Sequence, residues 1–234
     1  MPAPTTTAVV LAGGIGARAG HHLPKQLFEL DGRPLLAFAV DAFLASSRVD
    51  DVLVVMARAH LAAARDAVGE RVLDVVAGGE ERHDSVWLAL QHLRDHAGRV
   101  LVHDAARPLV PATLVDAVCD ALDAHDAVVP VLDVTDTVAR VEGDTIAEVP
   151  DRASLRRVQT PQGFDADVLW RAHARGRATP GFRPTDDASV VLRHGGSAGS
   201  GLPVHVVPGD ERAFKVTVPA DLDRLRRVLD ADPA

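Results

Sequence analysis

Short apolar runs alternate with amphipathic stretches between residues 8 and 132, and this alternation restricts the fold more than any other feature of the sequence. The apolar runs are typical of strands buried on both faces, and they cover Ala8 to Leu11, Val52 to Met56, Val72 to Val76, Val100 to His103 and Ala127 to Leu132. The stretches between them have apolar residues at helical spacing, over Pro34 to Leu44, Leu61 to Val68, Asp84 to Leu93 and Thr113 to Leu122. Alternating strands and helices build a mostly parallel sheet. The sequence therefore predicts an α/β fold with a single Rossmann-like, doubly wound, mostly parallel sheet.

The same pattern indicates where a ligand binds. Pro34 and Pro111 stand where helices are expected to begin, as proline often does. In open sheets of this class, ligands bind beyond the carboxyl ends of the strands. We therefore expect the functional residues in the segments that directly follow the predicted strands. Further along, Pro203 to Val207 predicts a last strand and Ala220 to Leu229 a last helix.

A hairpin signature follows Leu132. Two short runs, Thr135 to Val141 and Thr145 to Val149, flank the turn residues Glu142-Gly143-Asp144, which is typical of a β-hairpin. A hairpin that projects from the sheet exposes apolar residues and unpaired strand edges. We therefore expect a hairpin arm at about residues 133–155 that joins two copies of the chain in a homodimer. A hairpin folded back on its own domain is the alternative that the pattern leaves open.

The overall charge and apolar pattern restrict the partners. The formal net charge is −8 and the pI is about 5.7, whereas nucleic-acid binding needs a clustered basic face. No apolar run approaches the ~20 residues of a membrane span, and the first residues lack a signal sequence. Cys119 is the one cysteine, which suits a reducing compartment. We therefore expect a cytoplasmic protein with no nucleic-acid and no membrane partner.

Lysine is rare in this chain, which directs attention to the places where it occurs. Lys and Arg together number 25, but only Lys25 and Lys215 are lysines. The compact ammonium of lysine is a point charge suited to phosphate oxygens, whereas guanidinium is a planar fork. The pair predicts a phosphate site built from both ends of the chain. Two surface lysines retained by chance are the alternative, against which the neighbouring motifs argue.

The glycine-rich segment from Ala12 to Lys25 allows three interpretations. A Walker A loop requires Ser or Thr directly after its lysine, but Gln26 follows Lys25. A dinucleotide-binding loop should open a long helix, which Gly20 and Pro24 interrupt. The third interpretation is a loop that wraps a nucleoside triphosphate, with its backbone amides facing phosphate oxygens and with Arg18 and Lys25 neutralising the transferring phosphate. The sequence favours this third interpretation.

An acidic residue, Asp104, stands at the end of a predicted central strand. Mg²⁺ takes one or two carboxylates together with phosphate oxygens, so Asp104 is predicted to bind Mg²⁺ or another divalent cation. A structural role, in which Asp104 caps the turn or pairs with Arg107, is the alternative. His103 is expected to be a buried residue at the strand end rather than a metal ligand, since no second histidine has metal-binding spacing.

Six ordered motifs together resemble one family of enzymes over nearly the whole chain. They are Gly14-Ile15-Gly16-Ala17-Arg18 with Pro24-Lys25-Gln26; Gly78-Gly79-Glu80-Glu81-Arg82-His83-Asp84-Ser85-Val86; His103-Asp104-Ala105-Ala106-Arg107-Pro108; Thr160-Pro161-Gln162-Gly163-Phe164; Thr185-Asp186-Asp187-Ala188-Ser189; and Phe214-Lys215-Val216-Thr217. Their order resembles the 2-C-methyl-D-erythritol 4-phosphate cytidylyltransferases, in a wider cytidylyltransferase family that includes the ribitol-5-phosphate cytidylyltransferases. The resemblance implies a single nucleotidyltransferase domain over residues 1–234.

The resemblance also implies a role for particular residues. CTP binding is implied for Ala12, Gly13, Gly14, Ile15, Gly16, Arg18, Lys25, Gly79, Glu80, Ser85, Asp104 and Ala105. Binding of the sugar phosphate is implied for Thr137, Arg152, Thr160, Thr185, Asp186 and Lys215. The residues implied in catalysis are Arg18 and Lys25, which stabilise the transition state, and Arg152 and Lys215, which orient the sugar phosphate. In the family the hairpin of one subunit reaches the active site of its partner, so the Arg152 region is expected to act across a dimer.

The implied chemistry needs no general base. A phosphate monoester with a pKa near ~6 is largely dianionic at neutral pH, so it can attack the α-phosphorus of CTP directly. Positioning and cations are then sufficient for phosphoryl transfer. This accounts for a sequence without a visible Ser, His and Asp constellation for nucleophilic catalysis.

Two alternative activities remain open at this point. Ala12-Gly13-Gly14 is more common in the ribitol-phosphate relatives, whereas Asp151 to Leu155 and His103 to Arg107 look more like the methylerythritol group. We therefore favour methylerythritol phosphate as the acceptor, in non-mevalonate isoprenoid precursor synthesis, over ribitol 5-phosphate. A nicotinamide-dependent reductase needs an acid after the second strand to bind the ribose hydroxyls, but Arg58 stands there. Since an arginine could accept the phosphate of NADPH, an NADPH-dependent reductase stays open as the remote alternative. A nucleotide-sensing or scaffold protein is disfavoured because every motif position is chemically competent.

Overall fold

A single eight-stranded sheet forms the centre of the computed structural model, which describes residues 4–13, 24–96, 98–197 and 200–231. Its strands are β1 (Thr6–Leu11), β4 (Asp51–Met56), β5 (Asp74–Ala77), β6 (Arg99–Asp104), β7 (Ala127–Asp133), β10 (Arg156–Val158), β11 (Gln162–Asp165) and β12 (His205–Pro208). The strand order is β10-β7-β11-β6-β1-β4-β5, with β12 paired to β7. Pairing is parallel along β5-β4-β1-β6 and between β7 and β12. The predicted mostly parallel sheet is confirmed.

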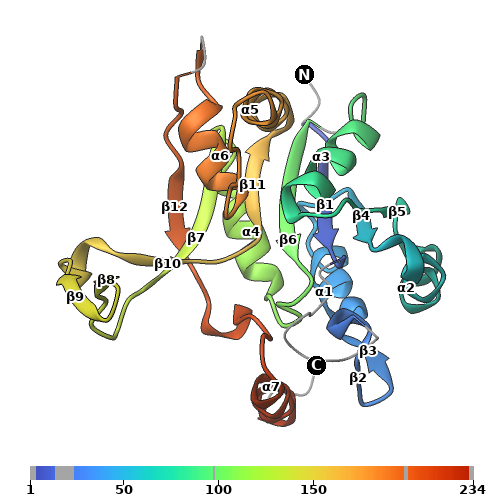
Figure 1. Cartoon of the computed structure of the whole chain (residues 1–234). Helices are drawn as coiled ribbons and strands as arrows, with labels where there is room; N and C mark the ends of the chain where they lie inside the picture. The colour runs from blue at the N-terminus through green and yellow to red at the C-terminus, as the bar shows by residue number, and fades with distance from the viewer. Residues whose placement is uncertain (1–3, 14–23, 97, 198–199, 232–234) are drawn as a thin grey trace.

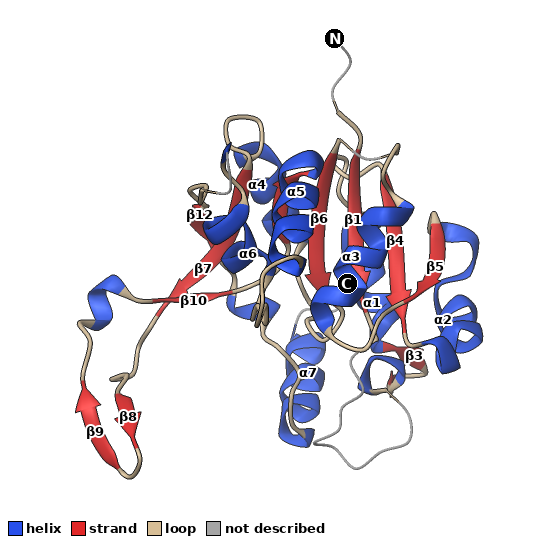
Figure 2. Cartoon of the chain, turned by 45° about the horizontal axis from the view of Figure 1, so that its top comes forward, coloured by secondary structure: helices blue, strands red, loops and turns tan. Residues whose placement is uncertain are grey.

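Helices cover both faces of the sheet, as Figure 2 shows. They are α1 (Leu35–Leu44), α2 (Leu61–Val68), α3 (Arg82–His92), α4 (Ala112–Ala121), α5 (Ala166–Arg177), α6 (Asp187–His194) and α7 (Pro219–Ala231). Successive residues of a strand point to opposite faces, so Ala8 and Val10 pack with α1, α2 and α4, while Val9 and Leu11 pack with α3, α5 and α6. Burial on both faces explains why the strands are continuous apolar runs in the sequence. Because helices cover both faces, the sheet is doubly wound.

The predicted element bounds agree with the structure to within about two residues for most helices and strands, a difference expected at frayed ends. Pro34 and Pro111 immediately precede α1 and α4, as predicted. Two antiparallel strands, β10 and β11, were not predicted. Both pair with β7, and β11 also pairs with β6. Their sequences lack the long apolar runs of the parallel strands, so periodicity gave no signal.

A hairpin arm projects beyond the β7 and β10 edge of the sheet (Figure 1). It contains β8 (Arg140–Glu142) and β9 (Thr145–Glu148), which pair with each other, and the 3-10 helix η4 (Arg152–Ser154). Gly143 in the turn has φ 64°, a conformation that glycine adopts readily. The alternative in which the hairpin folds back on its own sheet is therefore wrong.

The C-terminal helix α7 closes the end of the molecule at which the parallel strands finish. Its Leu225 is fully buried and packs in a small cluster with Phe214, Val216, Leu30 and Leu35. Leu30 belongs to β2 (Glu29–Leu30), which pairs with β3 (Arg33–Pro34). The cluster joins the last helix of the chain to the segment that follows the glycine-rich part of the sequence. Within the described part of the chain, no helix is both long and apolar enough to span a membrane.

Candidate functional site

The order of the strands reverses between β1 and β6, and the candidate site lies at this point. From β1 the chain proceeds to β4 and β5 on one side, then returns to β6 on the other. Such a reversal leaves a crevice beyond the carboxyl ends of the strands. Leu11 and Asp104 are partners in register at those ends. Ala12 and Gly13 follow β1, so the structure brings these predicted residues to one edge with Asp104 and Ala105.

Short backbone hydrogen bonds fix the two strand ends. The Ala12 N–H donates to the Val55 carbonyl at 2.7 Å, and the Ala105 N–H donates to the Leu11 carbonyl at 3.0 Å. Ala12 and Ala105 are fully buried and belong to the hydrophobic core that packs against α1, α2 and α4. The predicted CTP-binding residues Gly14, Ile15, Gly16 and Arg18 lie outside the described residues.

Two cations hold the Asp104 carboxylate. Lys215 Nζ donates to Oδ2 at 2.8 Å, and Arg82 Nε donates to Oδ1 at 3.1 Å. The Asp104 side chain is 15% exposed. Burial alone would raise its pKa, but the charges of Arg82 and then Lys215 outweigh burial and hold the pKa of Asp104 well below its usual range. Asp104 is therefore ionised at neutral pH.

Arg82 is the first residue of α3 and connects Asp104 to a second, deeper carboxylate. Arg82 NH1 donates to Asp187 Oδ2 at 2.7 Å. The other oxygen of Asp187 lies 3.0 Å from His173 Nε2, and both of these side chains are at most 1% exposed. Burial opposes ionisation of Asp187, yet Arg82 and then His173 lower the pKa of its carboxyl. The four side chains form a buried polar chain from α5 to the end of β6.

Thr160 and His103 support the backbone of Asp104 from below. Thr160 Oγ1 accepts from the Asp104 N–H at 3.2 Å and lies 3.0 Å from His103 Nδ1. His103 Nε2 lies 3.1 Å from the Arg107 carbonyl, which fixes Nε2 as the protonated nitrogen. Burial lowers the pKa of His103 to about 4. His103 is thus neutral near pH 7, and it is buried at the strand end as expected from the sequence.

The segment that carries Lys215 is tied to the sheet by hydrogen bonds on both sides of η6 (Glu211–Ala213). Gln159 accepts from the Asp210 N–H at 3.0 Å and donates to its carbonyl at 2.9 Å. Arg107 NH1 donates to the Ala213 carbonyl at 2.7 Å. The Val216 N–H donates to the Ala106 carbonyl at 2.7 Å. These bonds place the Lys215 ammonium over the end of β6.

Lys25 lies beside the same segment. Its Nζ donates to the Val216 carbonyl at 2.5 Å, across 191 residues of sequence. The two lysines of the chain therefore come together, because Val216 directly follows Lys215. Their predicted contact with phosphate groups stays a prediction, but the structure supplies the proximity that it requires.

The glycine motif before α3 gives close backbone packing on the other side of the crevice. The Gly79 N–H donates to Ser85 Oγ at 3.1 Å, and Ser85 Oγ donates to the Glu81 carbonyl at 3.3 Å. A Cβ atom on Gly78 would lie 2.6 Å from Ser85 Oγ, and one on Gly79 would lie 2.4 Å from Asp84 Cβ. Larger residues would therefore displace α3. Glu80 is exposed on this turn.

The predicted sugar-phosphate residues are distributed over several elements. Thr137 and Arg152 are exposed on the arm, where Arg152 NH1 donates to the Thr135 carbonyl at 2.7 Å. Thr185 is exposed before α6, whereas Asp186 caps α6 by accepting from the Ser189 N–H at 2.9 Å. Thr160 is only 4% exposed. Within this one chain, Lys215 is the member of the set that contacts the Asp104 carboxylate.

The site can supply one carboxylate to a divalent cation. No group of three or more His, Cys, Asp or Glu side chains among the described residues is arranged to hold a metal ion. Mg²⁺ bound with a nucleotide needs only one or two protein carboxylates, because phosphate oxygens and water complete its shell. Asp104 is ionised and partly exposed, so it fits this role. Its Oδ2 atom faces Lys215.

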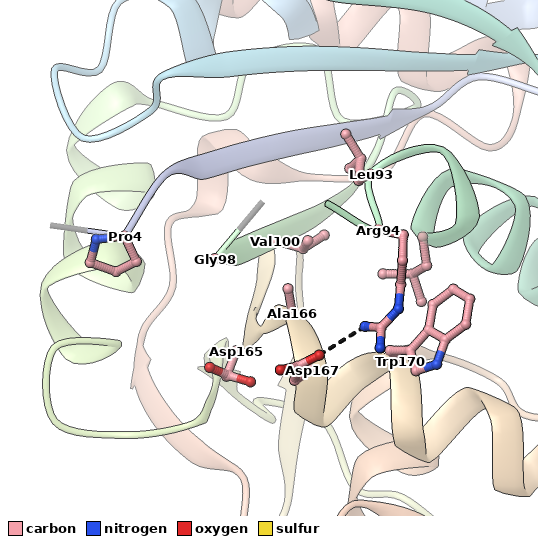
Figure 3. Close-up of a pocket in the computed structure, with 10 residues that line it drawn as sticks. Pro4, Leu93, Arg94, Gly98, Val100, Asp165, Ala166, Asp167 and Trp170 are labelled. Carbon is pink, nitrogen blue, oxygen red and sulfur yellow. Dashed lines mark hydrogen bonds and ion pairs between the residues drawn. The ribbon is translucent and has the colours of Figure 1, made fainter. Parts of the chain in front are cut away.

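A separate hollow lies at the opposite ends of the central strands (Figure 3). It is lined by residues that precede β1 and β6, including Pro4 and Gly98, and by side chains of α3 and α5. Arg94 donates to Asp167 at 2.8 Å and lies 4.6 Å from the Trp170 ring centre. Arg94 is thus paired within the hollow, and the predicted site residues do not line it.

One residue was not assigned a role from the sequence although its motif was singled out. Arg82 stands between the predicted residues Glu80 and Ser85. Asp84 accepts from the Glu81 N–H at 3.4 Å at the start of α3, and this start presents Arg82 toward Asp104. The arginine could have been suspected from its place after a glycine turn, but its two carboxylate partners are 22 and 105 residues away.

The comparisons with known proteins agree over nearly the full length. The family model described as 2-C-methyl-D-erythritol 4-phosphate cytidylyltransferase matches residues 6–230. The enzyme of that name from Thermobifida fusca is 45% identical, covering 94% of this chain and 91% of its own. The enzyme of that name from Streptomyces coelicolor is 46% identical, covering 96% of this chain and 84% of its own.

Solved structures give the same result. The crystal structure of 2-C-methyl-D-erythritol 4-phosphate cytidylyltransferase from Thermus thermophilus matches with TM-score 0.76 at 33% identity, covering 95% of this chain and 98% of that chain. The 4-diphosphocytidyl-2C-methyl-D-erythritol synthase from Anaerococcus prevotii matches with TM-score 0.83 at 24% identity, covering 97% and 96%. The second similarity supports the fold alone.

Replacing Arg82 with methionine should destabilise the fold, because it leaves the buried Asp187 carboxylate and the largely buried Asp104 carboxylate without their shared cation. We expect Arg82→Met to lower the free energy of unfolding by about 3–5 kcal/mol at pH 7. Asp104 and Asp187 have lowered pKa values in the folded state. Their stabilisation is therefore complete above the unfolded pKa of about 3.9 and is lost as pH falls through the folded pKa. Urea denaturation at pH 7 and pH 4.5 measures the effect.

In Arg82→Met the same two carboxylates lack their cation and therefore bind protons more readily. The loss of unfolding free energy relative to the wild type should therefore become smaller as the pH falls from 7 to 4.5. Arg226→Met is the matched control, because Arg226 pairs with Asp223 on an exposed face at 3.3 Å. We expect this control to change stability by less than about 1 kcal/mol. An Arg82→Met deficit that is equally small, or that does not depend on pH, contradicts the prediction.

Proposed function

The chain belongs to the 2-C-methyl-D-erythritol 4-phosphate cytidylyltransferase family, and from this premise we infer its reaction. It transfers the cytidylyl group of CTP to 2-C-methyl-D-erythritol 4-phosphate, giving 4-diphosphocytidyl-2-C-methyl-D-erythritol and pyrophosphate, a step of isoprenoid precursor synthesis. The match over residues 6–230 carries this conclusion. The relatives described above have the methylerythritol name, and nothing in them supports ribitol 5-phosphate or a reductase.

We propose that the reaction is a direct displacement at the strand-order reversal. An oxygen of the acceptor phosphate forms a bond to the α-phosphorus of CTP, and the bond from that phosphorus to the bridging oxygen of pyrophosphate breaks. Pyrophosphate leaves with the bonding electrons. Because the attacking phosphate is already largely dianionic near neutral pH, the protein need only position the two substrates and offset their charge.

Lys25 and Lys215 are the cations that we propose for this task. The short separation of their segments supports a site in which Lys25 faces the CTP phosphates and Lys215 faces the acceptor phosphate. Arg18 is proposed to assist Lys25, and its position lies outside the described residues. Asp104 is proposed to hold Mg²⁺ or another divalent cation, which would offset phosphate charge when bound.

The remaining contacts to CTP are proposed from the two strand ends and the α3 turn. Backbone amides of residues 12–16 are proposed to face the phosphates, as glycine-rich loops do. Gly79, Glu80 and Ser85 are proposed to surround the cytosine, with Ala105 beside the ribose. The tight packing of Gly79 against Asp84 leaves no room for a Cβ atom, and glycine of this kind is typical of a turn whose backbone approaches a ligand closely, which supports the proposal.

We also propose a cytoplasmic homodimer of single-domain subunits, each spanning residues 1–234 with its arm at about 133–155. Apolar side chains on the arm support an interface, because Val141, Ile146 and Val149 are 55%, 67% and 55% exposed. Arg152 and Thr137 lie on this same arm. In the proposed dimer they meet the acceptor phosphate in the partner's site. Thr160, Thr185 and Asp186 are proposed to complete the acceptor site.

The acceptor is tested by the release of pyrophosphate from CTP and Mg²⁺. We expect release with 2-C-methyl-D-erythritol 4-phosphate and none above background with D-ribitol 5-phosphate. Coupled detection of pyrophosphate measures both rates, and omission of the acceptor gives the hydrolytic background. Release with ribitol 5-phosphate alone would show that the protein activates a polyol phosphate instead. No release with either acceptor would contradict the proposed function.

The two lysines should fail in different ways. We expect Lys25→Ala to lower kcat by about 100-fold or more, since it removes a cation from the transferring phosphate, while circular dichroism stays as in the wild type. We expect Lys215→Ala chiefly to raise the KM for the sugar phosphate. The exposed Arg226→Ala is the control for loss of a positive charge. A near-normal rate for Lys25→Ala, or a loss of CTP affinity alone for Lys215→Ala, contradicts these roles.

Mixing two inactive variants tests the proposed dimer. If each site combines Lys25 of one subunit with Arg152 of its partner, a heterodimer of Lys25→Ala and Arg152→Ala subunits contains one intact site. Random pairing should then restore about a quarter of the wild-type activity. Co-refolding at equal concentrations followed by the pyrophosphate assay measures this. Activity no higher than the sum of the separate variants would show that Arg152 acts in its own subunit or in none.

A further inference from the structure

A buried ion-pair chain begins at Asp104 and extends away from the crevice into the helical layer. Arg82 bonds Asp104 through Nε and Asp187 through NH1, at 3.1 Å and 2.7 Å. His173 then lies 3.0 Å from the second oxygen of Asp187. Asp187 is 1% exposed and His173 is fully buried, so neither contacts a substrate in the crevice. Charged groups this deep are costly unless each is paired.

We propose that Asp187, held by His173, is a positioning residue for the cytidylyl transfer. It fixes the guanidinium of Arg82, and Arg82 in turn fixes the carboxylate of Asp104 against CTP. This inference rests on the role proposed above for Asp104. It assigns a function to a second carboxylate that is separated from Asp104 by 83 residues and lies behind it.

The geometry explains why Arg82 needs a second anchor. Its planar fork presents several donors in fixed directions. With Asp187 on NH1, the fork cannot rotate without breaking a bond to a buried charge, so Nε stays aimed at Asp104 Oδ1. Oδ2 is thereby directed toward Lys215. Without Asp187, Arg82 would be held by Asp104 alone, and only Lys215 would then hold that carboxylate from an anchored segment.

Other contacts make Asp187 a rigid support. Gln162 Oε1 on β11 accepts from the N–H groups of Asp187 at 3.2 Å and Ala188 at 3.0 Å. Asp186 caps the same helix. Asp187 is the first residue of α6, so its backbone is fixed by the sheet on one side and by the helix on the other. His173 on α5 accounts for the remaining carboxylate oxygen. Ordered surroundings of this kind are what maintain a site in its productive geometry.

A double-mutant cycle distinguishes positioning from a general structural role. We expect Asp187→Asn, which keeps the shape of the side chain, to lower kcat/KM for CTP by roughly 10- to 100-fold. In an Asp104→Asn background the same change should cost less than about 3-fold, because the group through which it acts is already gone. If Asp187 had only a general structural role, Asp187→Asn would lower kcat/KM by the same factor in the wild type and in the Asp104→Asn variant.

Asp165→Asn is the matched control. Asp165 caps α5 by accepting from the Val168 N–H at 2.9 Å, away from the polar chain, and asparagine is an equally good capping residue. Its kcat/KM should equal that of the wild type. Wild-type kcat/KM in Asp187→Asn, or full additivity with Asp104→Asn, would overturn the proposal.

A second variant covers the case in which Asp187→Asn does not fold. His173→Leu removes the hydrogen bond to Asp187 but leaves Arg82 and both carboxylates in place. We expect a smaller loss of kcat/KM that is again absent in the Asp104→Asn background, and an additive or absent effect would count against positioning.

Calorimetric titration with CTP separates this proposal from the proposed function. If the wild type binds CTP but releases no pyrophosphate, the proposed function is wrong. The double-mutant cycle is then repeated with the Kd for CTP as the measured quantity in place of kcat/KM. A Kd that is unchanged in Asp187→Asn and His173→Leu would in that case overturn the positioning role.

Discussion

The need to compensate the charge of one largely buried carboxylate organises the end of the molecule at which the parallel strands finish. Asp104 can remain ionised there only because cations from distant parts of the chain meet it, Arg82 from 22 residues before and Lys215 from 111 residues after. Each cation carries its own support. Arg82 depends on Asp187 and His173, and Lys215 depends on hydrogen bonds that tie its segment to Ala106, just after β6, and to Gln159. Without the Asp104 carboxylate, Arg82 and Lys215 would lose the anion that they both bind.

The reversal of strand order gives this carboxylate its place. Because β1 lies between β4 and β6, the segments after β1 and β6 face one crevice, and a nucleotide there can meet backbone groups and cations together. The antiparallel strands β10 and β11 extend the sheet on the other side of β6. They bring Thr160 under the Asp104 backbone and Gln162 under α6. The sheet extension therefore positions the site.

Much of the fold followed from local patterns, and less of the site did. The parallel strands and most helices were predictable because burial on both faces writes long apolar runs and helical spacing into the sequence. The hairpin arm was predictable from its turn residues. β10 and β11 were missed because Arg156 and Arg157 occupy most of β10, while β11, from Gln162 to Asp165, has no apolar run. The pairing of both strands with β7 is a long-range event. The motifs marked Asp104, Lys25 and Lys215, but not the role of Arg82.

The sequence by itself determined the fold class, the residues that follow the strands, and a family resemblance that the comparisons confirm. These features follow from local secondary-structure propensity and from the spacing of motifs, both of which are visible in the order of residues along the chain. Only the tertiary structure decided that Arg82 is shared by two carboxylates, that His173 supports the deeper one, and that Lys25 contacts the segment of Lys215. Such contacts join residues tens to hundreds of positions apart, and their geometry exists only once the sheet and its helices have packed.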